Sequence, residues 1–150
     1  MFFSTTRTAA TLIATALLSA CSTIGQDYRA APPPPEGQAL VYVMRSRMTA
    51  RFMWPTSFQM DGKHIASLHD KGYSWVHVPA GPHVLRAGLA VDAAFNDWLS
   101  VTINTRPGQV YYVEYAQFIE PGVGGKEVLR VLPEDLGQVT VPLYKFKPAE

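Results

Sequence analysis

The sequence has little of several features that would point directly to a function. Its 150 residues include a single cysteine, Cys21, and 13 Lys and Arg face 12 Asp and Glu, for a formal net charge of +1. One thiol excludes an internal disulfide framework and a zinc site built from several cysteines. The near balance of charge argues against a nucleic-acid partner, because binding phosphates requires a basic patch.

Motifs that carry catalysis are also missing. The sequence contains no G-x-S-x-G, H-E-x-x-H, P-loop or G-x-G-x-x-G pattern. None of its four histidines is spaced from another like a pair of metal ligands; they are His64, His69, His77 and His83. We therefore expect a protein that is not an enzyme and that has no metal site and no cofactor other than a covalent lipid.

The first twenty residues are typical of a secretory signal peptide. Arg7 precedes the apolar residues 9–18, a stretch too short to cross a bilayer of about 30 Å. The segment ends in a branched apolar residue, two small residues and the cysteine: Leu18, Ser19, Ala20 and Cys21.

This ending resembles the lipobox of bacterial lipoproteins. The resemblance implies cleavage after Ala20, a diacylglycerol on the thiol of Cys21 and an acyl chain on its new amino group. Two or three acyl chains anchor a protein stably, so we expect a membrane-tethered mature chain. Because Ser22 and not Asp follows the cysteine, we expect the outer membrane, with the protein facing the periplasm. An ordinary signal peptide followed by an unmodified cysteine is the alternative.

Residues 21–37 form the predicted tether. Pro32–Pro35 are four consecutive prolines, which fix φ and remove four backbone donors. The run predicts a semi-rigid polyproline II spacer that holds a domain off the lipid surface.

From residue 38 to residue 147 the pattern predicts one β-domain. Seven or eight short strands, with turn signals about every ten residues, indicate an all-β antiparallel sandwich, immunoglobulin-like or PEGA-like. Residues 133–137 predict a single helical turn, and residues 139–146 predict a last strand that Pro142 confines to an edge.

Two turns fix the expected neighbours of several strands. Asp61-Gly62 predicts a type I′ hairpin that pairs Met60 with Lys63 and Phe58 with Ile65. The turn at residues 79–82 predicts a second hairpin, in which Trp75 faces Arg86 as a cation–π pair.

The order of these motifs resembles a family of bacterial lipoproteins with a domain of unknown function. The motifs are a Val-Tyr-Val-x-Arg strand ending at Arg45, the Asp61-Gly62 turn, Val78-Pro-Ala-Gly-Pro-His83 and Pro107-Gly-Gln-Val-Tyr-Tyr112. The order resembles PEGA-type β-sandwich modules more loosely. The resemblance covers residues 39–116, and most of the motifs that carry it are residues that form turns. It therefore implies a fold and no catalytic residue.

The sequence supports three hypotheses about function. The first is a lipid-anchored, non-catalytic interaction module for an envelope protein or peptidoglycan, with Trp54, Trp75 and Arg86 as its partner surface. Phe52, Met53 and Trp54 form an apolar loop that either tucks into the core or is exposed. The second is a small-ligand or glycan binder whose pocket is lined by the two tryptophan rings. The third is an envelope enzyme with perturbed titratable groups clustered in one cleft.

Overall fold

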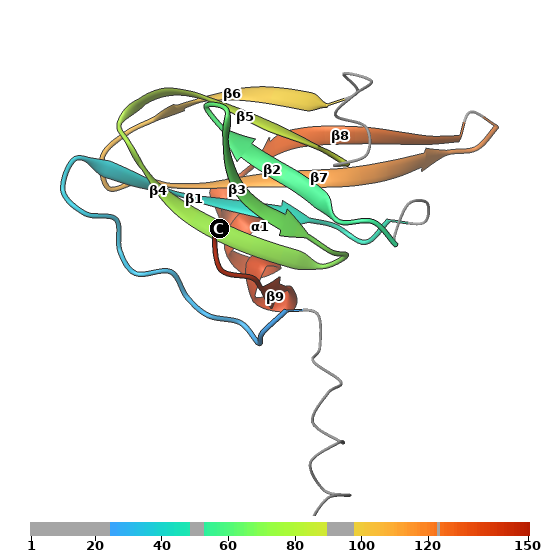
Figure 1. Cartoon of the computed structure of the whole chain (residues 1–150), viewed down its shortest axis with the longest axis horizontal. Helices are drawn as coiled ribbons and strands as arrows, with labels where there is room; N and C mark the ends of the chain where they lie inside the picture. The colour runs from blue at the N-terminus through green and yellow to red at the C-terminus, as the bar shows by residue number, and fades with distance from the viewer. Residues whose placement is uncertain (1–24, 49–52, 90–97, 123) are drawn as a thin grey trace, which may run out of the picture.

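The computed structural model describes residues 25–48, 53–89, 98–122 and 124–150. Over these residues nine strands form two packed sheets with one short α-helix beside them (Figure 1). The predicted all-β sandwich is confirmed. The lipobox residues Leu18 to Cys21 lie outside the described residues. In the part of the chain that is described, no helix is long and apolar enough to span a membrane.

Sheet A contains five strands, which in spatial order are β8 (Gly124–Leu132), β7 (Val110–Glu120), β1 (Gln38–Arg45), β4 (Gly72–Pro79) and β9 (Lys145–Phe146). Sheet B contains four strands, in the order β3 (Lys63–Leu68), β2 (Thr56–Met60), β5 (Gly81–Leu89) and β6 (Leu99–Thr105). Strand β1 runs parallel to β7, and β4 runs parallel to β9. Sheet A is therefore mixed, whereas the sequence pattern predicted antiparallel pairing throughout.

The main core lies between the two sheets. Val41 and Val43 of β1 meet Phe58 and Leu85 of sheet B, and all four are completely buried. Burying a side chain of this kind contributes roughly 1.5–3 kcal/mol. Strand β6 alternates an inward Ile103 with exposed Thr102 and Asn104 on either side, as its burial pattern shows.

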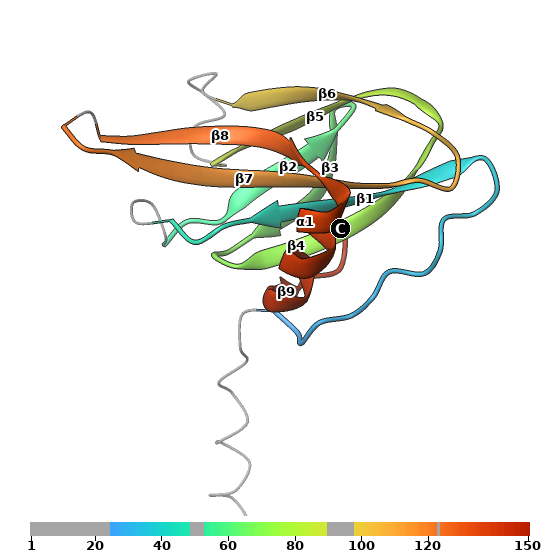
Figure 2. The same cartoon turned by 180° about the vertical axis from the view of Figure 1, so that it is seen from behind.

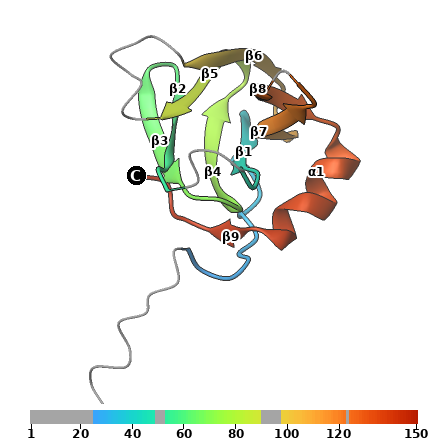
Figure 3. The same ribbon diagram turned by 90° about the vertical axis from the view of Figure 1, so that its right-hand side faces the viewer.

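A third layer covers the outer face of sheet A. It consists of α1 (Glu134–Thr140), a 3-10 helix η3 (Val141–Leu143) and the segment 25–37 (Figure 3). The rings of Tyr42 and Tyr112 stack there with centroids 5.2 Å apart and planes 3° apart. Helix α1 approaches closely because Gly137 has no side chain: a Cβ at Gly137 would lie 2.1 Å from Cγ of Tyr112. Strand β1 is consequently buried on both faces, as its apolar run predicted.

The proline-rich segment lies along this layer instead of standing free. The hydroxyl of Tyr73 accepts a hydrogen bond from the N–H of Arg29 and donates one to its carbonyl, both at 2.7 Å. The hydroxyl of Tyr42 accepts from the N–H of Ala31 at 3.0 Å. The segment could not be placed from the sequence, because these tyrosines reach it only once the register of sheet A puts them on its outer face. Burial raises the pKa of Tyr73 to about 12.

The predicted hairpin across residues 79–82 is wrong. Strand β4 pairs with β1 in sheet A, and β5 pairs with β2 and β6 in sheet B, so this turn carries the chain from one sheet to the other. Trp75 lies opposite Tyr42, and the expected Trp75–Arg86 pair does not form. The guanidinium of Arg86 instead lies 5.7 Å from the ring centroid of Trp98.

The Asp61-Gly62 turn is confirmed, with φ of 50° and 80° as a type I′ turn requires. Met60 pairs with Lys63 as predicted. Phe58 pairs with Ala66 and not with Ile65, because the register shifts between Phe58 and Gln59. A bulge of this kind inserts one residue without a sequence signal as strong as that of the turn.

The predicted last strand is also wrong over most of its length. Residues 139–143 belong to α1 and η3, and only Lys145 and Phe146 form a strand. Helix α1 continues through Gly137, where the predicted helical turn ended. The close fit of Gly137 on Tyr112 and the burial of Val141 override the β-propensity of this segment.

Candidate functional site

A pocket of about 290 Å³ is lined by residues at the β2–β3 and β4–β5 turns. Apolar side chains of Ile65, Val76 and Val78 line it. Polar side chains also line it, including three of the four histidines: Asp61, Lys63, His64, His77, His83 and Glu150. We call it the histidine pocket. It is at the small end of the range for small-molecule sites.

His83 is held by two acceptors. Its Nδ1 lies 2.6 Å from Oδ2 of Asp61, and its Nε2 lies 2.8 Å from the carbonyl oxygen of Pro79. A carboxylate and a carbonyl both accept, so this arrangement favours the imidazolium, which donates from both ring nitrogens. Burial lowers the pKa of His83, but the bonds to Asp61 and Pro79 outweigh it and the net pKa is raised.

Asp61 is fixed from the other side by β5. Its Oδ1 accepts a hydrogen bond of 2.9 Å from the N–H of Val84. The hydrogen bond from His83, followed by that from Val84, lowers the pKa of the Asp61 carboxyl. The turn of one hairpin is thereby joined to the first residues of β5, so the wall of the pocket is preorganised.

We expect His83→Asn to destabilise the protein more in acid than in alkali. Because folding raises the pKa of His83 above its unfolded value of 6.5, the ion pair adds its full contribution to the free energy of unfolding below pH 6.5. This contribution is lost as the pH rises through the folded pKa. The lowered pKa of Asp61 keeps its charge present down to a pH below 3.8. In urea unfolding at about pH 5.5, His83→Asn should have a free energy of unfolding roughly 1 kcal/mol lower than the natural protein. At about pH 8.5 this difference should be smaller. An equal loss at both pH values would contradict the imidazolium, and His69→Asn serves as the control.

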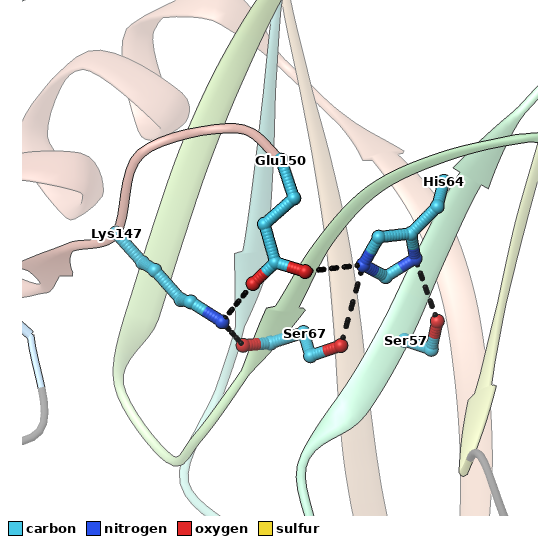
Figure 4. A network of polar contacts seen from close by, with 5 residues as sticks. All are labelled: Ser57, His64, Ser67, Lys147 and Glu150. Atoms are coloured by element: carbon cyan, nitrogen blue, oxygen red, sulfur yellow. Dashed lines mark hydrogen bonds and ion pairs between the residues drawn. The ribbon is translucent and has the colours of Figure 1, made fainter.

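His64 is the centre of a second polar network (Figure 4). Its Nδ1 lies 3.1 Å from Oγ of Ser57, and its Nε2 lies 3.0 Å from Oε2 of Glu150. Lys147 donates to the carbonyl of Ser67 at 3.1 Å and also to the carboxylate of Glu150. The N–H of Glu150 donates to the carbonyl of Ile65 at 2.7 Å. Residues 147–150 are thus attached along the edge of β3, and Ala149 and Glu150 form one side of the pocket.

Ser57, His64 and Glu150 have the composition of a hydrolase triad. In such a triad the hydroxyl must be exposed to a substrate beside donors for an oxyanion. Ser57 is only 6% exposed and does not line the pocket. The network therefore orders the edge of sheet B and presents no nucleophile. Among the described residues, no group of three or more histidine or acidic side chains is arranged to hold a metal ion.

A different surface lies at the opposite end of the sandwich. The β7–β8 hairpin extends beyond the other strands there (Figure 2). Strand β1 runs parallel to β7 and ends at the same end of the sandwich, where Arg45 donates to the carbonyl of Trp54. Four large apolar side chains at this end are 43–68% exposed: Met53, Trp54, Phe118 and Ile119. We call these four residues the apolar tip. The guanidinium of Arg130 lies 4.9 Å from the ring centroid of Phe118 and holds that ring on the hairpin.

The three residues of the predicted partner surface lie in three different places. Trp54 belongs to the apolar tip, whereas Trp75 is half-buried on the outer face of sheet A, stacked on Phe146. Arg86 is exposed on sheet B. Neither tryptophan lines the histidine pocket. Of the apolar loop, Met53 and Trp54 are exposed, and Phe52 lies outside the described residues.

The comparisons with known proteins concern the sandwich. A family model described as "Protein of unknown function (DUF2846)" matches residues 35–125. The match begins in the proline-rich segment and ends at the start of β8, so it covers more than half of the chain. A search of curated proteins found no match.

Proposed function

The chain belongs to the DUF2846 family of proteins of unknown function, and we propose that it is a lipid-anchored, non-catalytic interaction module of the bacterial envelope. The apolar tip is the observation that carries this proposal. Exposed apolar side chains that gather on one surface mark interaction sites, and aromatic residues are enriched in them. Phe118 and Ile119 lie on the projecting β7–β8 hairpin (Figure 1), which suits a groove on a partner protein better than it suits a small ligand.

The anchoring half of the proposal depends on the sequence. Leu18, Ser19 and Ala20 before Cys21 match a lipobox, and two or three acyl chains hold a protein stably at a bilayer. Ser22 after the cysteine favours the outer membrane, with the domain facing the periplasm. The partner we propose is an envelope protein, and binding to peptidoglycan is the other outcome of the test.

A photo-crosslinking residue in place of Ile119 tests the proposal in cells. We expect one stoichiometric protein adduct, because Ile119 is 61% exposed at the apolar tip. The matched control places the same residue at Thr102, which is exposed on sheet B. Trp54→Ser should weaken the adduct by about thirtyfold if this ring is a hot spot worth about 2 kcal/mol. Equal adducts from both positions, or none from either, would contradict a partner at the tip.

The same experiment in a Cys21→Ala background tests the anchor. Without the thiol there is no lipid, so the protein should leave the membrane fraction and its adduct should diminish. Retention of Cys21→Ala in the membrane fraction would contradict the lipobox assignment.

The histidine pocket favours a second candidate function, the binding of a small ligand. Its apolar floor and preorganised rim suit such a molecule, but no tryptophan ring is available there for stacking on a sugar. Chemical-shift changes at Ile65 and His64 on titration with small ligands, without changes at Trp54, would favour this candidate over the apolar tip.

A further inference from the structure

We propose that α1 and η3 form a contact with the lipid bilayer, so that the sandwich lies on the membrane with a fixed face instead of hanging from a flexible tether. This inference rests on the proposed lipid anchor at Cys21. It assigns a role to a surface that is separate from both the apolar tip and the histidine pocket.

The helical segment carries apolar side chains on two opposite sides. Gly137 and Val141 face sheet A, where both are buried. The other side carries Leu136, Val139 and Leu143, which are 44–74% exposed. Their spacing of three and four residues places them along one line on a helix. We call them the outer stripe. A helix packed on a sheet needs only one apolar side, so the outer stripe requires a second apolar neighbour.

The chain that leads to the anchor is fixed beside this stripe. Gln26 exchanges two backbone hydrogen bonds with Phe146, of 2.7 and 2.8 Å, and Phe146 lies three residues after Leu143. Asp27 adds an ion pair of 2.6 Å to Nζ of Lys145. The described chain begins next to β9 (Figure 3), which follows η3 in the chain. Residue 25 is therefore held on the same layer as the outer stripe.

The distance to the lipid is short. Gly25 lies four positions after Cys21, and an extended chain spans at most about 3.6 Å per residue, so the two Cα atoms lie within about 14 Å. Side chains of a bilayer-bound helix enter the headgroup region by about 5–10 Å. A lipid on Cys21 thus brings the layer that carries the outer stripe to the bilayer surface.

The charges of this layer indicate how the contact is made. The first turn of α1 carries Glu134 and Asp135, and its last turn carries no basic residue. Lys145 is paired with Asp27, and Arg29 is the one other basic side chain among the described residues of this layer. With no basic cluster to attract acidic headgroups, the contact depends on apolar burial and should be the same on zwitterionic and on anionic vesicles.

The test uses the full lipidated chain with an environment-sensitive fluorophore on a single introduced thiol. Leu143→Cys reports on the outer stripe, and Thr102→Cys on sheet B is the matched control. In phosphatidylcholine vesicles we expect a blue shift at residue 143 and loss of its fluorescence with a lipid-embedded quencher, and neither effect at residue 102. Adding phosphatidylglycerol should leave both signals unchanged.

Each other result has a defined meaning. If the lipidated chain does not sediment with vesicles, the proposed anchor fails. If it sediments but residue 143 stays in water, or if residue 102 is quenched equally, the bilayer contact is overturned while the anchor stands. If lipid-free Cys21→Ala protein forms a dimer that Leu143→Ser abolishes, the outer stripe is a contact between two copies and the inference is also overturned.

Discussion

Replacing Arg45 by methionine should lower the free energy of unfolding by about 3–5 kcal/mol, the usual cost of removing one partner of a buried charge pair. Arg45 is completely buried at the end of β1. Nη2 of its guanidinium lies 3.2 Å from Oδ1 of Asp70. Nη1 donates a hydrogen bond of 3.0 Å to the carbonyl of Leu68 and another to the carbonyl of Trp54. Methionine fills much of the volume but leaves these acceptors without their donor. The loss would be measured by urea unfolding.

Arg86→Met is the matched control for this substitution. Arg86 is exposed and contacts the ring of Trp98, an interaction worth about 0.5–1 kcal/mol. Equal losses for the two variants would contradict the role assigned to Arg45. Because Arg45 also holds the backbone at Trp54, Arg45→Met should in addition weaken the crosslink from the apolar tip.

Gly137→Ala should destabilise the protein by about 1–3 kcal/mol, the usual cost of overpacking. The same change inside an exposed helix stabilises by about 1 kcal/mol, so even the sign of the effect is diagnostic. The new Cβ would lie 2.1 Å from Cγ of Tyr112, and α1 would have to move off sheet A. Thermal unfolding would measure the loss.

A smaller side chain in place of Tyr112 should remove most of this loss of stability. In the Tyr112→Ala background, which lacks the Cγ and Cδ2 atoms nearest to the new Cβ, Gly137→Ala should cost much less, which a double-mutant cycle would report as coupling between the two positions. Gln138→Ala, on the exposed part of the same helix, controls for helix propensity. Stabilisation by Gly137→Ala in the natural background would show that α1 does not pack closely on the sheet.

The parts of the fold that local chemistry determines could be predicted from the sequence. The turn at residues 106–109 forms as the Pro-Gly signal indicates, with φ of 73° at Gly108 and a hydrogen bond of 3.2 Å from the N–H of Gln109 to the carbonyl of Arg106. The Asp61-Gly62 turn forms for the same reason. Which strands become neighbours depends on packing over long distances in the chain, so the parallel pair of β1 and β7 had no local signal.

The functional surfaces could be predicted only in part. Trp54 stood out as an aromatic residue in a loop, and it is exposed. Phe118 and Ile119 were missed, because the apolar pattern of their strand was expected to end at residue 116, whereas β7 continues to Glu120. His83 ends the Val78-Pro-Ala-Gly-Pro-His83 motif, and its ring bonds within that motif to the carbonyl of Pro79. Its ion pair with Asp61 required the register of β2 against β5, which no residue pattern showed.

The parallel pairing of β1 with β7 has a consequence for the order in which the molecule assembles. Val41 pairs with Tyr111, about seventy positions later in the chain. Closing a contact over such a separation is entropically costly and slows folding. As the chain is synthesised or exported from its first residue, β1 emerges early with seven consecutive residues that end up buried, and one of its edges has no neighbour until β7 follows. During that interval β1 is an aggregation-prone edge, and a chaperone that holds extended apolar segments would have its greatest effect there.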